Sequence, residues 1–186
     1  MSLAEYIQTI QLHLIGTFGR LLDWCDRPEP LKRFRPADGG WTALEVLEHV
    51  VLTNHFLLIL IDKGAAKALR NVRGLVVEDE LARADLSLDA FESIGVHRAF
   101  PWERIEHADP GGRMTEHEIR ARLIDQLTRC LAHLARLDGG QGLLHRTTMS
   151  VQGLGKITVY EYVYFLSQHA RRHAGQLDAN AREFEG

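Results

Sequence analysis

The sequence predicts an all-α protein, a four-helix bundle that forms a single domain over residues 1–186. Two observations lead to this prediction. Four long segments each place apolar side chains three, four or seven residues apart, which is the spacing of one helix face. Each segment also begins with Ser or Thr followed three residues later by Glu, the capping-box pattern of a helix start. Four apolar faces must cover one another, and a bundle achieves this.

The first two predicted helices cover residues 3–25 and 42–62. Their capping boxes are Ser2 with Glu5 and Thr42 with Glu45. The first helix has an apolar face made by Ile7, Leu14, Phe18, Leu21 and Cys25. The second has a face with two polar members, made by Glu45, His49, Leu52, Phe56 and Ile59. We expect both faces to point into the bundle.

The third and fourth predicted helices cover residues 115–137 and 158–182. Their capping boxes are Thr115 with Glu118 and Thr158 with Glu161. The face of the third helix is made by Ile119, Leu123, Leu127, Cys130 and Leu134. The face of the fourth is made by Tyr162, Leu166, His169, His173 and Gln176. The fourth helix therefore places two histidines where apolar residues are expected.

The connection between helices two and three determines how we expect them to run. It extends from Lys63 to Met114 and contains turn signals such as Asp109-Pro110-Gly111-Gly112. A 23-residue helix is about 35 Å long, a distance that roughly 11 extended residues can span. One long crossover with helices two and three parallel therefore fits best. We expect short helices near residues 78–84 and 88–93 in it, and either a hairpin or a loop at residues 147–158.

Composition argues against several classes of protein. The net charge of −3 does not favour nucleic acid or an anionic membrane as a partner. The longest apolar run, Phe56–Ile61, is far shorter than the roughly 20 residues of a membrane span. Glu5 and Gln8 interrupt any secretory signal. Cys25 and Cys130 are far apart on apolar helix positions, which is typical of buried free thiols in a cytoplasmic protein.

The histidine spacing indicates a metal site. His169 and His173 are four residues apart, so their side chains lie about 5–6 Å apart on one helix face. His49 lies at the same level of the bundle if helices two and four are antiparallel. Three neutral imidazoles could bind Zn²⁺, Ni²⁺ or a similar divalent ion and leave a position open for water or substrate. The alternative is a set of hydrogen-bonded core histidines without a metal.

Other metal motifs do not fit. The zincin pattern needs Glu directly after the first His of the pair, and position 170 is Ala. Ferritin-like di-iron bundles need Glu-x-x-His on two helices, and this pattern occurs nowhere in the chain. The sequence therefore favours a mononuclear site of three histidines.

Two polar residues are candidates for a catalytic role next to the histidines. Glu45 lies one turn before His49 and could orient it or accept a proton. Its alternative role is the helix capping already described. Gln176 lies one turn beyond His173 and could bind substrate or a metal ligand. Its alternative role is packing near the end of the bundle.

Two motifs give the sequence a family resemblance. Gly40-Trp41-Thr42 is followed by Glu45 and His49, and Tyr164-Phe165 is followed by His169, His173 and Gln176. This pattern resembles the DinB/YfiT-like superfamily of metalloenzymes over nearly the whole chain. The resemblance implies an up-down-down-up bundle, a divalent metal bound by the three histidines, and often a homodimer. Members with assigned activities include S-transferases and isomerases that use low-molecular-weight thiols.

Three hypotheses about function remain open at this stage. The first is a metal-dependent transferase that adds a small thiol to an electrophile. The second is a metal-dependent hydrolase, and the third is a non-catalytic metal-binding or ligand-binding bundle. Basic side chains beside the metal would favour a charged thiol, but the helical phase of Arg171 and Arg172 predicts that both point away from the site.

Overall fold

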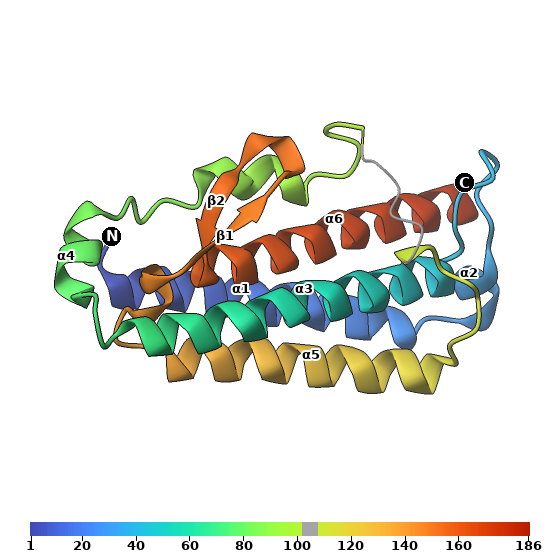
Figure 1. The fold of residues 1–186 in the computed structure, drawn as a ribbon. Coiled ribbons are helices and arrows are strands. Elements are labelled where there is room, and N and C mark those ends of the chain that lie inside the picture. The colour runs from blue at the N-terminus through green and yellow to red at the C-terminus, as the bar shows by residue number, and fades with distance from the viewer. Residues whose placement is uncertain (102–107) are drawn as a thin grey trace.

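Four long helices make up the bundle in the computed structural model, which describes residues 1–101 and 108–186 (Figure 1). They are α1 (Leu3–Cys25), α3 (Ala43–Asn71), α5 (Glu116–Arg136) and α6 (Val159–Glu185). All four capping boxes are formed, each with its Ser or Thr side chain accepting from the backbone N–H of the Glu. The predicted all-α class and the four predicted helix starts are confirmed.

The contacts between helices give their directions. Asn54 and Asp62 of α3 contact Gln126 and His133 of α5, in the same order along both helices. Helices α3 and α5 are therefore parallel. Figure 1 shows α1 and α6 running in the opposite direction. Because α3 and α6 are antiparallel, the first half of α3 lies beside the second half of α6.

Helix α3 is longer than predicted, since it ends at Asn71 and not near residue 62. Gly64 does not end the helix but lies in close contact with α6. A Cβ added at Gly64 would lie 3.4 Å from Cγ2 of Val159. Ala65 and Ala68 are also buried, so small residues continue the buried face and allow the close approach.

The buried face of α3 also differs from the predicted one. Glu45, His49, Leu52, Phe56 and Ile59 are all half-buried, and the fully buried face lies beside them on the helix. The apolar members of that buried face include Val46, Leu47, Val50, Leu58 and Ile61. The prediction was wrong in phase because α3 is apolar over much of its circumference, so more than one stripe has helical spacing. The predicted faces of α1, α5 and α6 are buried, apart from half-buried Leu127 and Gln176.

The apolar character of α3 has a second consequence. Among the described helices, α3 has the length and composition that a membrane span would also require, with a mean hydropathy of 1.6 in its most apolar window. Half of that window is buried inside the bundle. Core helices pass the same test, so this finding is weak evidence for a membrane span.

The long crossover contains the two short helices that the sequence predicted, α4 (Val77–Arg83) and the 3₁₀ helix η1 (Asp89–Gly95). Helix η1 packs directly on α6. A Cβ at Gly95 would lie only 2.0 Å from Oε1 of Gln168, so glycine is needed for this approach. Tyr164 and Arg171 of α6 donate to the Glu92 carboxylate of η1, at 2.7 and 2.9 Å. These contacts place the chain after η1 over the second half of α6.

A hairpin connects α5 to α6 by way of the 3₁₀ helix η3 (Gln141–Leu144). Its strands are β1 (Arg146–Met149) and β2 (Gly155–Thr158), paired antiparallel with Met149 opposite Gly155. The hairpin turn contains the 3₁₀ turn η4 (Val151–Gly153). The sequence left a hairpin and a loop as alternatives, and the structure has the hairpin. A further short helix, α2 (Glu29–Arg33), follows α1 and was not predicted.

Candidate metal centre

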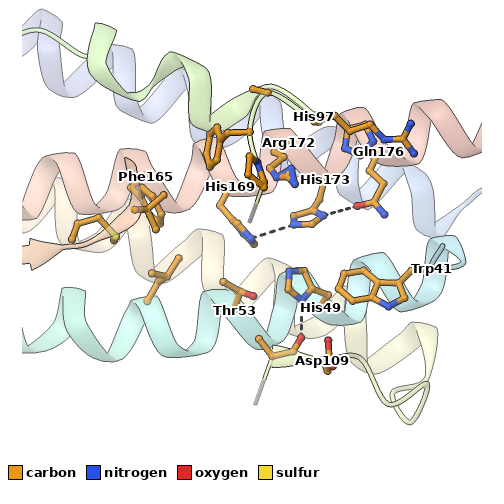
Figure 2. A pocket seen from close by; sticks show the side chains of 18 of the residues that line it. Trp41, His49, Thr53, His97, Asp109, Phe165, His169, Arg172, His173 and Gln176 are labelled. Carbon is orange, nitrogen blue, oxygen red and sulfur yellow. Dashed lines mark hydrogen bonds between the residues drawn. The ribbon is translucent and has the colours of Figure 1, made fainter. Parts of the chain in front are cut away.

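Three histidines from two helices meet between α3 and α6 (Figure 2). Each of His49, His169 and His173 offers one ring nitrogen, and these atoms all lie within 4.8 Å of one another. The Nε2 atoms of His169 and His173 are 3.2 Å apart. The His49 ring lies 4.7 Å from the His173 ring and 5.5 Å from the His169 ring, measured between centroids. The antiparallel arrangement of the two helices brings the trio together.

Hydrogen bonds to oxygen atoms orient the rings of His49 and His173. Nδ1–H of His49 donates to the Ala108 carbonyl at 2.6 Å, and Nδ1–H of His173 donates to Oε1 of Gln176 at 2.9 Å. Both acceptors are oxygens that can only accept, so the proton is on Nδ1 in each ring. The Nε2 atoms of His49 and His173 therefore carry lone pairs available to an ion. Metal-binding histidines commonly have such an outer hydrogen bond.

The surroundings keep the histidines of α6 uncharged. Burial lowers the pKa of His169 well below its ordinary value, and the neighbouring His173 and His49 lower it further. Burial also lowers the pKa of His173 well below its ordinary value, with His49 as the next cause. Both rings are therefore neutral at neutral pH, which is the form that binds metal.

The geometry fits a single divalent ion. Two nitrogens that each lie about 2.0–2.1 Å from one tetrahedral Zn²⁺ are about 3.4 Å from each other. The 3.2 Å separation of the His169 and His173 Nε2 atoms agrees with this value. The 4.8 Å limit for the whole trio is wider, so binding would draw the His49 ring inward. Three protein nitrogens leave at least one coordination position for water or substrate.

The two predicted catalytic candidates lie in different places. Gln176 contacts His173 and lines the cavity beside the histidines. Glu45 is not among the described residues that line the cavity. Its carboxylate accepts from the Thr42 N–H at 2.8 Å and from the Arg35 guanidinium at 2.8 and 3.0 Å. The expectation that Glu45 acts at the metal therefore has no support from its position, because the cap and Arg35 hold it at the helix start.

The histidines open into a cavity of about 790 Å³ between α3, α6, the chain after η1 and the hairpin. Trp41 covers His49, with ring centroids 4.8 Å apart and planes at 40°. Much of the remaining wall is apolar and includes Leu57, Phe100, Met149, Val151 and Phe165. A few polar groups set in apolar walls are typical of a small-molecule site.

Three basic residues that sequence reasoning did not assign to the site also line the cavity: His97, Arg98 and Arg172. The prediction for Arg172 was wrong, since it lies between His169 and His173 along α6 and beside His97 (Figure 2). Only Arg171 points away, toward Glu92. Helical phase alone missed Arg172 because the chain after η1 builds a cavity wall on that side of α6. Burial lowers the pKa of Arg172, but an Arg guanidinium stays charged at neutral pH.

The fold and the site together define a class of protein, a helical bundle with a three-histidine centre suited to a divalent metal. The sequence model of the DinB superfamily matches residues 19–177, a range that includes all three histidines. The chain therefore belongs to the DinB superfamily. A search of curated proteins and a search of solved structures each found no match.

Proposed function

We propose that the protein is a divalent-metal-dependent enzyme that transfers a low-molecular-weight thiol to a small electrophilic substrate. The proposal takes Zn²⁺ or Ni²⁺ as the ion and His49, His169 and His173 as its ligands. The observation that favours a thiol is the position of Arg172 beside these histidines in one cavity. A cation next to the centre can bind the carboxylate of an anionic thiol such as a cysteine derivative.

In this proposal the metal ion, the hydrogen-bond partners of the histidines and Arg172 each have a separate role. A divalent ion lowers the pKa of a thiol or water that it binds, which supplies a nucleophile near neutral pH. The Ala108 carbonyl and the Gln176 side chain fix the rings of His49 and His173. Arg172 orients the anionic end of the thiol. In an addition to an activated C=C bond, the sulfur forms a C–S bond and the thiol proton ends on the neighbouring carbon, so no oxidant is required.

A metal-dependent hydrolase is the competing candidate, because water can occupy the same open coordination position. Binding of a thiol and binding of water differ in one measurable respect. A thiol with a carboxylate would bind Arg172 even when no electrophile is present, whereas a water molecule on the metal would not need Arg172. The third possibility, a non-catalytic metal-binding bundle, predicts no exchangeable position on the ion.

The test uses the Co²⁺-substituted protein and two thiols of similar size, mercaptoacetate and uncharged 2-mercaptoethanol. We expect both to change the visible spectrum, with mercaptoacetate binding at least tenfold more tightly. Arg172→Met should remove this preference, while Arg171→Met, the neighbouring arginine outside the cavity, should keep it. A spectrum that does not respond to either thiol would overturn the transferase proposal. Ester hydrolysis by such a protein would then favour the hydrolase.

Two further expectations belong to the same proposal. A homodimer follows from the family resemblance, and a cytoplasmic location from the free cysteines Cys25 and Cys130. The proposed partners are small molecules, with neither nucleic acid nor membrane among them. Sedimentation of the metal-loaded protein measures the oligomeric state directly.

A further inference from the structure

The cavity extends from the histidines to the hairpin, which lines it with Met149, Ser150 and Val151. We refer to the part between His169 and the hairpin as one half of the cavity. We propose that it is a subsite for an apolar group of the electrophilic substrate, an aromatic ring system or an alkyl chain of up to about eight carbons. The inference rests on the proposed function in one respect, because the three histidines mark where the reacting atom lies.

The dimensions of this half follow from α6. Phe165 lies four residues before His169 and Tyr162 lies seven before it, on the same side of the helix. At 1.5 Å of rise per residue, these side chains lie about 6 and 10 Å along the helix axis from His169. In Figure 2, Phe165 lies on the opposite side of His169 from Trp41 and Gln176. A group bound there is thus one to two helix turns from the metal-binding nitrogens.

The chemistry of this half is apolar. Leu57 of α3, Phe165 of α6, and Met149 and Val151 of the hairpin line it, together with the polar or weakly polar Tyr162, Thr53 and Ser150. The basic lining residues belong to the chain after η1 and to Arg172. Among the described lining residues, the only acidic one is Asp109, which is exposed and follows the Ala108 that contacts His49. Burying a charged group here would cost free energy, so the subsite favours a neutral apolar group.

The hairpin closes this end of the cavity. Met149 is the last residue of β1, and Val151 begins the turn that reverses the chain. The reversal uses left-handed backbone at Gln152, with φ of 49°, and at Gly153, with φ of 68°. Val151 lines the cavity and is half-buried, so part of its side chain faces the cavity and part is exposed. The hairpin turn is therefore the part of the fold that sets the length of the apolar group.

The test measures binding to the metal-free protein, so that it does not depend on the reaction. A neutral naphthalene dye, 6-propionyl-2-(dimethylamino)naphthalene, is displaced by straight-chain alcohols from butan-1-ol to decan-1-ol. We expect affinity to rise by about fourfold for each added methylene and to level off near eight carbons. Val151→Asp should weaken octan-1-ol binding at least tenfold. The matched control Val76→Asp changes a valine that is 55% exposed before α4, and binding should be unaffected.

Two results would overturn the inference. One is an affinity that does not depend on chain length. The other is equal binding by Val151→Asp and by the wild-type protein, which would place the dye on another apolar surface. Metal affinity serves as the folding control, because Val151→Asp should bind Co²⁺ as the wild type does. Apolar binding without thiol transfer would contradict the proposed function alone, and thiol transfer without apolar binding would contradict the subsite alone.

Discussion

At the scale of single residues, the candidate metal centre contains hydrogen bonds that hold imidazole rings in one orientation. His49 donates to a backbone carbonyl, whereas His173 donates to the side chain of Gln176. The first partner cannot be removed by a side-chain substitution, and the second can. The two α6 histidines are also buried, which lowers their pKa values, so at neutral pH they are already in the neutral form that metal binding requires.

Removing a ligand should abolish metal binding and leave the fold. We expect His169→Ala and His173→Ala each to lose most metal affinity, because two nitrogens remain of the three. Helix content should be largely unchanged, since the apolar faces of the four helices supply most of the folding free energy. Titration with Co²⁺ and circular dichroism measure the two quantities. His117→Ala, on the exposed side of α5, is the control. Unfolding of either variant would show that the histidines are structural.

Gln176 should act on the metal through His173. Replacing an outer hydrogen-bond partner of a metal-binding histidine typically lowers metal affinity about 10-fold to 100-fold. We expect Gln176→Ala to fall in this range, well short of the loss in His173→Ala. Gln176→Glu should recover much of the affinity, because a carboxylate also accepts from Nδ1–H. Unchanged metal affinity in Gln176→Ala would instead assign this side chain to substrate binding or packing.

At the scale of elements, close packing at small residues sets where the short segments lie. Gly95 allows η1 to lie on α6, and Gly142 allows η3 to lie on the ring of Tyr160.

Between α3 and α5, the buried side chains of Asn54 and Gln126 are hydrogen-bonded at 3.1 Å, and Gln126 also donates to the Val51 carbonyl at 2.8 Å. A sliding of α3 along α5 would break these bonds inside the core, so they favour a single register of the two helices.

The contact between η3 and α6 gives a test at this scale. A Cβ at Gly142 would lie 2.5 Å from Cζ of Tyr160, whose side chain is fully buried and has no room to move. We expect Gly142→Ala to lower the free energy of unfolding by about 1–3 kcal/mol. Gly16→Ala is the matched control, because nothing lies within 4 Å of its added Cβ on α1. That substitution should raise stability by about 0.5–1 kcal/mol through helix propensity. Urea unfolding measures both, and a neutral Gly142→Ala would contradict the packing described.

At the scale of the whole molecule, the buried histidines link stability to pH. In the metal-free protein, the folded-state pKa values of His169 and His173 lie well below the ordinary value of about 6.5 that applies when the chain is unfolded. Above pH 6.5 the rings are neutral in both states and add no pH dependence. As the pH falls below 6.5, the unfolded chain takes up protons first, so the folded state loses relative stability.

We therefore expect the free energy of unfolding to decrease from pH 6.5 to 5.5, by up to about 1.4 kcal/mol per pH unit for each of the two histidines. Urea unfolding of metal-free protein at pH 7.5, 6.5 and 5.5 measures this. His13, His97 and His145 also have lowered pKa values and add to the slope. A His169→Gln/His173→Gln double variant should have a smaller slope. A stability that is constant or rises toward pH 5.5 would contradict the burial of the two rings.

The sequence by itself predicted the starts of the four long helices and the three histidines of the candidate metal centre, because both depend on local spacing. A capping box needs residues three apart, and the pairing of His169 with His173 needs residues four apart on one helix. The prediction that His49 joins this pair required one further assumption, that α3 and α6 are antiparallel. The lengths of elements were less certain, since Gly64 is compatible with a helix end and also with the close packing that the structure has.

Tertiary structure alone decided the walls of the cavity. Helical phase placed Arg172 outside the site, and only the chain after η1, which packs on α6 through Gly95, makes that side of the helix part of a cavity. Arg35 similarly pairs with Glu45 at the start of α3, and Glu45 is not among the described residues that line the cavity. Met149 and Val151 reach the cavity because the segment forms a hairpin. Each of these outcomes depends on a contact with another element of the fold, and side-chain periodicity along one helix contains no information about such contacts.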